Sequence, residues 1–183
     1  MSVVVGRIIE LFDSTCSKQF ESMSCDIHLL DIADFQHRKN LVCSLIECQS
    51  DDVQLALVIS ATRGFLDNTM PVIDEQQLSI AEGQSDWCLE LANRFLGRLK
   101  NKLLSHGCSL NMGLPKLIEC GSESKAMPSS DSKVTRVFQI NSSDEESLIC
   151  CYLRISLLSD KVALDDYEDE DEDWFDESEL QHL

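Results

Sequence analysis

The sequence predicts an α+β fold in which a mainly antiparallel sheet is covered by two long helices. Two segments, one at the N-terminus and one mid-chain, have apolar residues every three to four positions, as in an amphipathic helix. The remaining apolar segments are short, rich in β-branched residues and joined in pairs by polar turns. Because hairpin-linked strands run antiparallel and each helix has one apolar face to bury, both helices are expected to pack on the sheet.

The first helix is predicted from Val3 to about Met23. Its apolar residues form one stripe at helical spacing: Val4, Ile8, Leu11, Phe12, Cys16 and Phe20. An irregular stretch is expected to follow as far as Asn40. Leu41–Cys48 and Val53–Ser60 are then predicted to pair as a hairpin, because the residues between them, Gln-Ser-Asp-Asp, are typical of a turn.

The second helix is predicted from about Leu78 to Ser105, after Pro71 and a polar run, with Gly107 as its C-terminal cap. Ser109–Cys120 is expected to be extended, with Pro115 restricting it to an edge or irregular strand.

Gly121–Lys133 is polar and Ser-rich, which predicts a mobile loop. Val134–Asn141 and Leu148–Leu158 are predicted to form a second hairpin. In its last strand Cys151, Leu153, Ile155 and Leu157 are expected to point inward, and Tyr152, Arg154 and Ser156 outward, which gives one packed and one unpacked face. The order of helix, two strands, helix and about three strands suggests a weak internal duplication.

Charge divides the chain into a predicted domain, residues 1–160, and an acidic tail, residues 161–183. The net charge is −18, and Asp165–Leu183 contributes eleven acids and no Lys or Arg, which leaves −7 for residues 1–164. This balance argues against nucleic acid as a partner. The tail is expected to be disordered. The alternatives are a docking arm anchored by Trp174 and Phe175, or a segment that occludes the protein's own helix face.

No apolar run approaches the roughly 18 residues of a membrane span, and the N-terminus lacks the features of a secretory signal. We therefore expect a cytoplasmic protein with no membrane partner. The nine cysteines are odd in number and include no CxxC pair, which indicates reduced core thiols in a reducing compartment. The cysteines and four histidines show no zinc-ligand spacing, so no metal site is predicted.

The polar face of the second helix is the candidate site. Its residues recur at steps of four, three, four and four: Asp86, Glu90, Asn93, Gly97 and Asn101. Any helix at a protein surface has a polar face, so this spacing alone is weak evidence of function. A mid-helix glycine, however, costs up to about 1 kcal/mol relative to alanine. Close approach of another protein surface would explain Gly97.

This segment resembles the signature of the CheC/CheX/FliY family of chemotaxis phosphatases. In that family a helix bears an acid, a Glu and an Asn, and a Pro follows at nearly the distance that separates Asn93 from Pro115, 22 positions. The run Glu90–Leu99, followed by Lys102-Leu103 and Gly107, is similar to the CheX branch in particular. The resemblance covers about Asp86–Leu117; the rest of the chain matches only in element order.

The resemblance implies a phosphatase that hydrolyses the aspartyl phosphate of a CheY-like response-regulator receiver domain. The receiver supplies its own Mg²⁺ and Lys, so no cofactor of the chain's own is expected. Asn93 would position the attacking water, since an amide donates and accepts without adding negative charge. Glu90 would pair with the receiver's Lys. Asp86, Gly97 and Pro115 would support docking or local structure, and a homodimer joined through sheet edges is also implied.

Two other hypotheses remain open. The hairpin before the helix lacks the glycines expected of the family, and the tail is long and acidic. These features motivate the alternative of a non-catalytic adaptor that binds a receiver or a flagellar or signalling component, although the presence of both Glu90 and Asn93 argues against it. A purely structural acidic scaffold would leave the polar stripe unexplained. In the first helix, Gly6, Glu10 and Asp13 have a similar spacing, but an acid replaces the amide. We expect any remnant site there to be inactive, so that each chain has one site.

Overall fold

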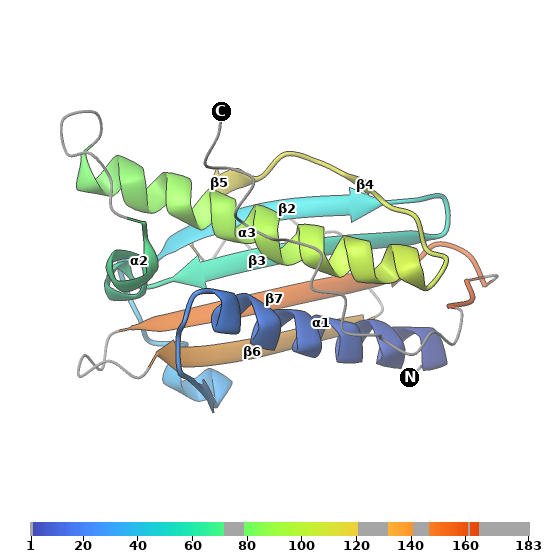
Figure 1. Ribbon diagram of the computed structural model, residues 1–183, viewed down its shortest axis with the longest axis horizontal. Helices are drawn as coiled ribbons and strands as arrows, with labels where there is room; N and C mark the ends of the chain where they lie inside the picture. The colour runs from blue at the N-terminus through green and yellow to red at the C-terminus, as the bar shows by residue number, and fades with distance from the viewer. Residues whose placement is uncertain (1, 72–78, 121–131, 141–146, 161, 165–183) are drawn as a thin grey trace.

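The structure, a computed structural model, describes residues 2–71, 79–120, 132–140, 147–160 and 162–164 (Figure 1). All of its helices and strands lie between Val3 and Leu157. The predicted loop 121–133 falls almost entirely outside the described residues. The acidic tail does so from residue 165 onward.

Seven strands form one sheet in which every pair is antiparallel, as predicted. In chain order they are β1 (Ile27–Leu30), β2 (Val42–Gln49), β3 (Val53–Ala61), β4 (Asn111–Met112), β5 (Lys116–Ile118), β6 (Ser132–Ile140) and β7 (Leu148–Leu157). Their spatial order is β1-β6-β7-β3-β2-β4, and β5 also pairs with β2.

This strand order supports the suggested duplication and adds a short strand or strand pair to each half. Each half consists of a long helix, a short strand or strand pair, and a hairpin: α1, β1 and β2–β3, then α3, β4–β5 and β6–β7. The short strand of each half pairs with the hairpin of the other half, and the two hairpins meet at the central pair β3–β7. The halves are therefore interlocked in one sheet and share one core.

The two long helices, α1 (Val3–Ser22) and α3 (Ile80–Ser105), lie side by side on the same face of the sheet and run in opposite directions (Figure 1). α3 begins with a capping box, in which Ser79 and Glu82 satisfy each other's backbone N–H groups. It ends before Gly107, whose φ of 79° is the left-handed conformation predicted for the cap.

Phe20 of α1 is at the centre of the core. It is fully buried and contacts the rings of Phe95, Phe138 and Phe65 at centroid distances of 5.5, 4.8 and 6.3 Å. These partners belong to α3, to β6 and to a short helix, α2 (Arg63–Thr69). One aromatic side chain thus joins three helices to the sheet.

Three expectations need correction. The stretch before Asn40 is not irregular throughout, because it contains β1 and a 3-10 helix, η1 (Ile32–Asp34). The helix α2 was not predicted, although Thr62 caps it by accepting a hydrogen bond from Phe65 N. The last strand is not unpacked on its outer face, since Arg154 is only 1% exposed there.

The burial of Arg154 results from its place in a central strand. Its cross-strand partner Ala56 belongs to a second apolar cluster, with Leu45 and Val58, on the side of the sheet away from α1 and α3. β3 and β7 each have a strand on both sides, so neighbouring side chains cover this face as well.

All nine cysteines are free, and Cys16, Cys43, Cys88 and Cys151 are buried, as predicted for core thiols. None of the helices in the described part of the chain combines the length and apolar composition that crossing a membrane requires.

Candidate functional site

The polar stripe of α3 faces outward. Asp86 is exposed, the Glu90 side chain is 44% exposed, and Asn93 and Gly97 are partly exposed. Leu91 and Ala92, which lie between Glu90 and Asn93 in the sequence, are both fully buried. Because a helix turns 100° per residue, burial of these two directs Glu90 and Asn93 to the opposite side. The predicted pair therefore lies on one accessible face.

The side of α3 opposite to this stripe is hydrogen-bonded to the sheet. Ser44 of β2 donates a hydrogen bond of 3.0 Å from its hydroxyl to the carbonyl oxygen of Cys88. Cys88 is two residues before Glu90, so this hydrogen bond positions the Glu90 turn of α3 relative to β2.

A chain of polar contacts leads from α2 to Glu90. The indole Nε1 of Trp87 donates to Thr69 Oγ1 at 3.0 Å, and the Arg94 guanidinium lies 5.2 Å from the centre of the Trp87 ring. Arg94 Nε then donates to Glu90 Oε1 at 2.7 Å. Contacts of this kind at partly exposed positions contribute about 0.5 kcal/mol each, so together they favour one orientation of the Glu90 carboxylate. Glu90 is thus oriented before any partner binds.

Gln84 strengthens the attachment of α2 to α3. It is buried, accepts a hydrogen bond from Arg63 Nη1, and donates from Nε2 to Asp67 Oδ1 at 2.7 Å. Trp87 and Arg94 were not singled out in the sequence. The available signal was their spacing along one helix: Trp87 is three residues before Glu90, and Arg94 is four residues after it.

Asn93 differs from Glu90 in that its amide makes no hydrogen bond to any residue that the structure describes. One turn further along, a methyl group added at Gly97 would meet no atom within 4 Å. The glycine is therefore not required by packing within the chain. The amide and the bare backbone beside it are both available to another molecule.

A strand edge flanks the stripe on the Asn93 side. Leu117 of β5 is the cross-strand partner of Ser44, so it is on the helix-bearing side of the sheet. Leu117 and Leu114 are 49% and 91% exposed, and Pro115 lies between β4 and β5, where no ladder hydrogen bond is needed. Pro115 was singled out in the sequence, whereas these two apolar side chains were missed.

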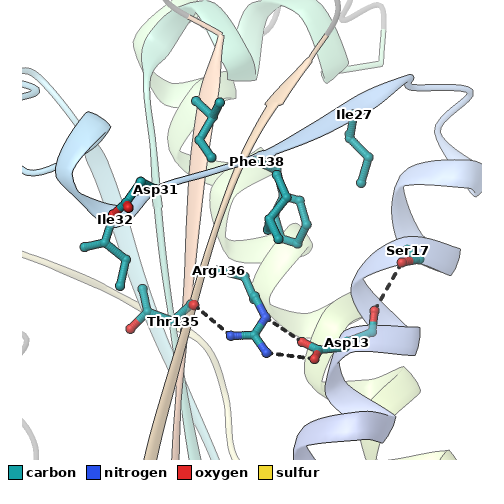
Figure 2. A pocket seen from close by; sticks show the side chains of 10 residues that line it. Asp13, Ser17, Ile27, Asp31, Ile32, Thr135, Arg136 and Phe138 are labelled. Atoms are coloured by element: carbon teal, nitrogen blue, oxygen red, sulfur yellow. Dashed lines mark hydrogen bonds and ion pairs between the residues drawn. The ribbon is translucent and has the colours of Figure 1, made fainter.

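The corresponding positions of α1 have a different environment. Arg136 holds Asp13 through two hydrogen bonds of 2.8 Å, Nε to Oδ1 and Nη2 to Oδ2 (Figure 2). Arg7 Nη1 lies 3.2 Å from Glu10 Oε2. Both carboxylates that match Glu90 and Asn93 in spacing are thus paired with arginine.

Asp13 and Arg136 also line a cavity of about 620 Å³ between α1, β1, η1 and β6 (Figure 2). Its other walls are mainly apolar, with Ile27, Leu29 and Phe138 among them. No residue of the α3 stripe lines it, so the cavity is separate from the candidate site.

Cysteine chemistry is disfavoured at the core thiols. Burial raises the pKa of Cys88 to about 11 and that of Cys48 to about 12. A hydrogen bond with Cys16, together with burial, raises the pKa of Cys151. These thiols stay protonated at neutral pH and are poor nucleophiles. Among the described residues, no group of three or more His, Cys, Asp or Glu side chains is arranged to hold a metal ion.

No protein-family model matches the chain, and no curated protein matches it in sequence. Its structure is nevertheless similar to that of the chemotaxis protein CheX from Vibrio vulnificus, with a TM-score of 0.58 over 81% of this chain and 96% of that one, at 14% identity. The CheX–CheY–BeF3–Mg complex from Borrelia burgdorferi matches equally well, with a TM-score of 0.58, coverage of 81% and 97%, and 15% identity.

A CheC-like superfamily protein from Shewanella sp. PV-4 matches over 85% of this chain and 99% of that one, with a TM-score of 0.54 and 19% identity. These similarities extend over nearly the whole length of the other chains. The chain has the CheC/CheX fold, as the resemblance of the α3 segment led us to expect.

Proposed function

We propose that the chain acts in chemotaxis-type signalling as a phosphatase that hydrolyses the aspartyl phosphate of a CheY-like receiver domain. The observation that carries this proposal is the pair on α3: an oriented carboxylate at Glu90, and three residues later an accessible amide at Asn93 with no hydrogen bond to any described residue.

In this proposal Asn93 positions the attacking water. The amide carbonyl accepts a hydrogen bond from the water and the NH₂ group donates toward the phosphoryl oxygens, which orients the water in line with the bond that breaks. A neutral side chain suits this role, because a carboxylate at the same place would repel the phosphoryl group. The Mg²⁺ that neutralises the phosphoryl charge would be held by the receiver, not by this chain.

Glu90 would orient the receiver through its active-site lysine. Its Oε1 accepts from Arg94, and its Oε2 has no hydrogen bond with the described residues. One oxygen is thus anchored and the other is open to a cation. Gly97 would allow close approach of the receiver, while exposed Asp86, Leu114 and Leu117 would border the contact. Such preorganisation contributes to catalysis by fixing the reacting geometry before the chemical step.

The fold is the second line of support. One of the similar structures is a complex of CheX with CheY, which makes a CheY-like receiver the first partner to test.

The decisive experiment measures loss of phosphate from candidate receivers phosphorylated with a small-molecule donor, with Mg²⁺ present. Asn93→Ala is expected to lower the stimulated rate about 100-fold, because the water loses its orienting group. Asn111→Ala, the same change at an exposed position of β4, is the matched control and should leave the rate within about twofold. Equal rates for the wild type and Asn93→Ala would refute the catalytic proposal.

The Arg94–Glu90 ion pair favours one alternative, a non-catalytic adaptor. If Arg94 keeps the carboxylate neutralised in the complex, the receiver would be bound without its lysine being engaged. The adaptor predicts receiver binding with no acceleration of phosphate loss in either the wild type or Arg94→Gln. The phosphatase predicts acceleration by the wild type.

A further inference from the structure

A strip of positive charge runs along the junction of α1 and α3. It consists of Lys18 on α1 and of Arg98 and Lys102 on α3, which we call the basic strip. Arg98 Nη1 donates to the Lys18 carbonyl oxygen at 3.1 Å, and Lys102 Nζ donates to Ser14 Oγ at 2.7 Å. These contacts place the Arg98 and Lys102 side chains where the two helices meet, and Lys18 is one turn from Ser14 on the same face of α1. All three residues are partly buried. Like charges held so close favour binding of an anion.

The described part of the chain ends on the side of the sheet that bears α1 and α3, the side on which this strip lies. Leu157 ends β7 opposite Val53, and Leu158 N donates to Asp52 O at 2.7 Å. α3 ends and α1 begins at this same end of the sheet (Figure 1). Val162 and Leu164 then pack against the core that α1 and α3 cover. The last described residue is therefore on the helix-bearing side.

The segment after Leu164 is opposite in charge to the basic strip. Residues 165–183 contain eleven acids and no Lys or Arg, together with Trp174 and Phe175. Fully extended, this segment could reach about 60 Å at roughly 3.3 Å per residue, whereas Lys102 and Arg98 are about 6 Å apart along α3. The segment is therefore long compared with the strip, and its acids begin directly after the last described residue.

We propose that the acidic C-terminal segment, residues 165–183, docks on the basic strip of its own chain. The interaction is mainly electrostatic and does not require the segment to adopt one fixed conformation. Arg98 is one turn from Arg94, so the docked segment borders the stripe that carries Glu90 and Asn93. A partner approaching that stripe must displace or accommodate the segment. The docking itself does not depend on the proposed phosphatase activity.

The test uses the full chain labelled with 5-fluorotryptophan, which places one ¹⁹F probe at Trp174 and one at Trp87, the two resonances being assigned with Trp174→Phe. The Trp174 resonance is compared with that of a synthetic peptide of residues 165–183. At low salt the two chemical shifts are expected to differ. They should converge at about 0.5 M salt, where charges are screened over a few ångströms.

Two triple variants separate the strip from general charge. Lys18→Gln/Arg98→Gln/Lys102→Gln should bring the Trp174 resonance to the peptide value at low salt. Lys39→Gln/Lys116→Gln/Lys133→Gln makes the same change of net charge at exposed positions elsewhere and should leave it unchanged. The Trp87 resonance reports whether each variant keeps its fold.

Three outcomes would overturn the inference. In the first, Trp174 resonates at the peptide value in the wild type at low salt. In the second, both triple variants shift it equally. In the third, the shift develops only as the protein concentration rises, which would assign the strip to the tail of a second copy. The salt titration of the wild type decides the question even if the strip variant fails to fold.

Discussion

The two long helices of this protein occupy equivalent places and differ in what they do with the same spacing of polar residues. α1 has Glu10 and Asp13, and α3 has Glu90 and Asn93. On α1 both acids are paired with arginine, and Asp13 is held by Arg136 through two hydrogen bonds. On α3 only the glutamate is paired, and the amide stays open.

The difference separates a polar face that joins a helix to the sheet from one that stays accessible. A carboxylate in the Asn93 position would attract a nearby arginine, and such a pair joins α1 to β6. A neutral amide attracts no such partner and stays available. Three predictions test this comparison, from the largest expected effect to the smallest.

The first prediction concerns Phe20, the core side chain through which α1 packs against α3. Phe20→Ala should lower the free energy of unfolding by about 3–5 kcal/mol, because it leaves a cavity between α1, α2, α3 and β6. Urea denaturation measures this. Val3→Ala, at a position of α1 that is 89% exposed, should change it by less than about 0.5 kcal/mol. Equal effects would mean that α1 is not packed on the core as described.

The second prediction exchanges the distinguishing residues. Asn93→Asp should reduce receiver dephosphorylation about 100-fold, close to 2.7 kcal/mol in barrier height, because it adds charge where water must be oriented. Asp13→Asn should produce no new activity. It should lower the free energy of unfolding by about 1 kcal/mol through loss of the ion pair with Arg136. Retained activity in Asn93→Asp, or a second active site in Asp13→Asn, would contradict the comparison.

The third prediction concerns Gly97. Gly97→Ala should stabilise α3 by up to about 1 kcal/mol, since the new methyl group meets no atom within 4 Å. If another protein approaches the helix here, the same change should weaken receiver binding several-fold, as measured by titration calorimetry. A stabilised protein with unchanged affinity would show that Gly97 is not at the contact.

Elements that are long enough to show a repeating apolar pattern could be predicted from the sequence. The limits of α1 and α3 and the pairing of β2 with β3 and of β6 with β7 follow from apolar spacing and turn residues. β1 and α2 could not be found this way. β1 is four residues long and α2 is seven, too short for a period to emerge, and β1 is a strand only because β6 pairs with it.

The candidate site also has features that the sequence predicts and features that it does not. The outward direction of Glu90 and Asn93 is fixed by the helical period and the burial of Leu91 and Ala92. The orientation of Glu90 by Arg94 and Trp87 depends on side-chain conformations and on Thr69 of α2, an element that the sequence did not reveal. Burial of Arg154 likewise depends on the position of β7 in the middle of the sheet, which only the strand order determines.

The split between β4 and β5 limits how copies of this protein can aggregate or join. β4 has two residues and β5 has three, and Gly113-Leu114-Pro115 separates them. Both strands pair with β2, and each is too short to pair with a strand of another copy. On the other side of the sheet β1 pairs with only Val137–Ile140 of β6, so the described edge consists of β1 and of the remaining part of β6. The homodimer through sheet edges that the family resemblance implies would therefore have to form on this β1–β6 side. A sheet with one usable side can pair with one further copy, and the joined sheet then has no second usable side for growth.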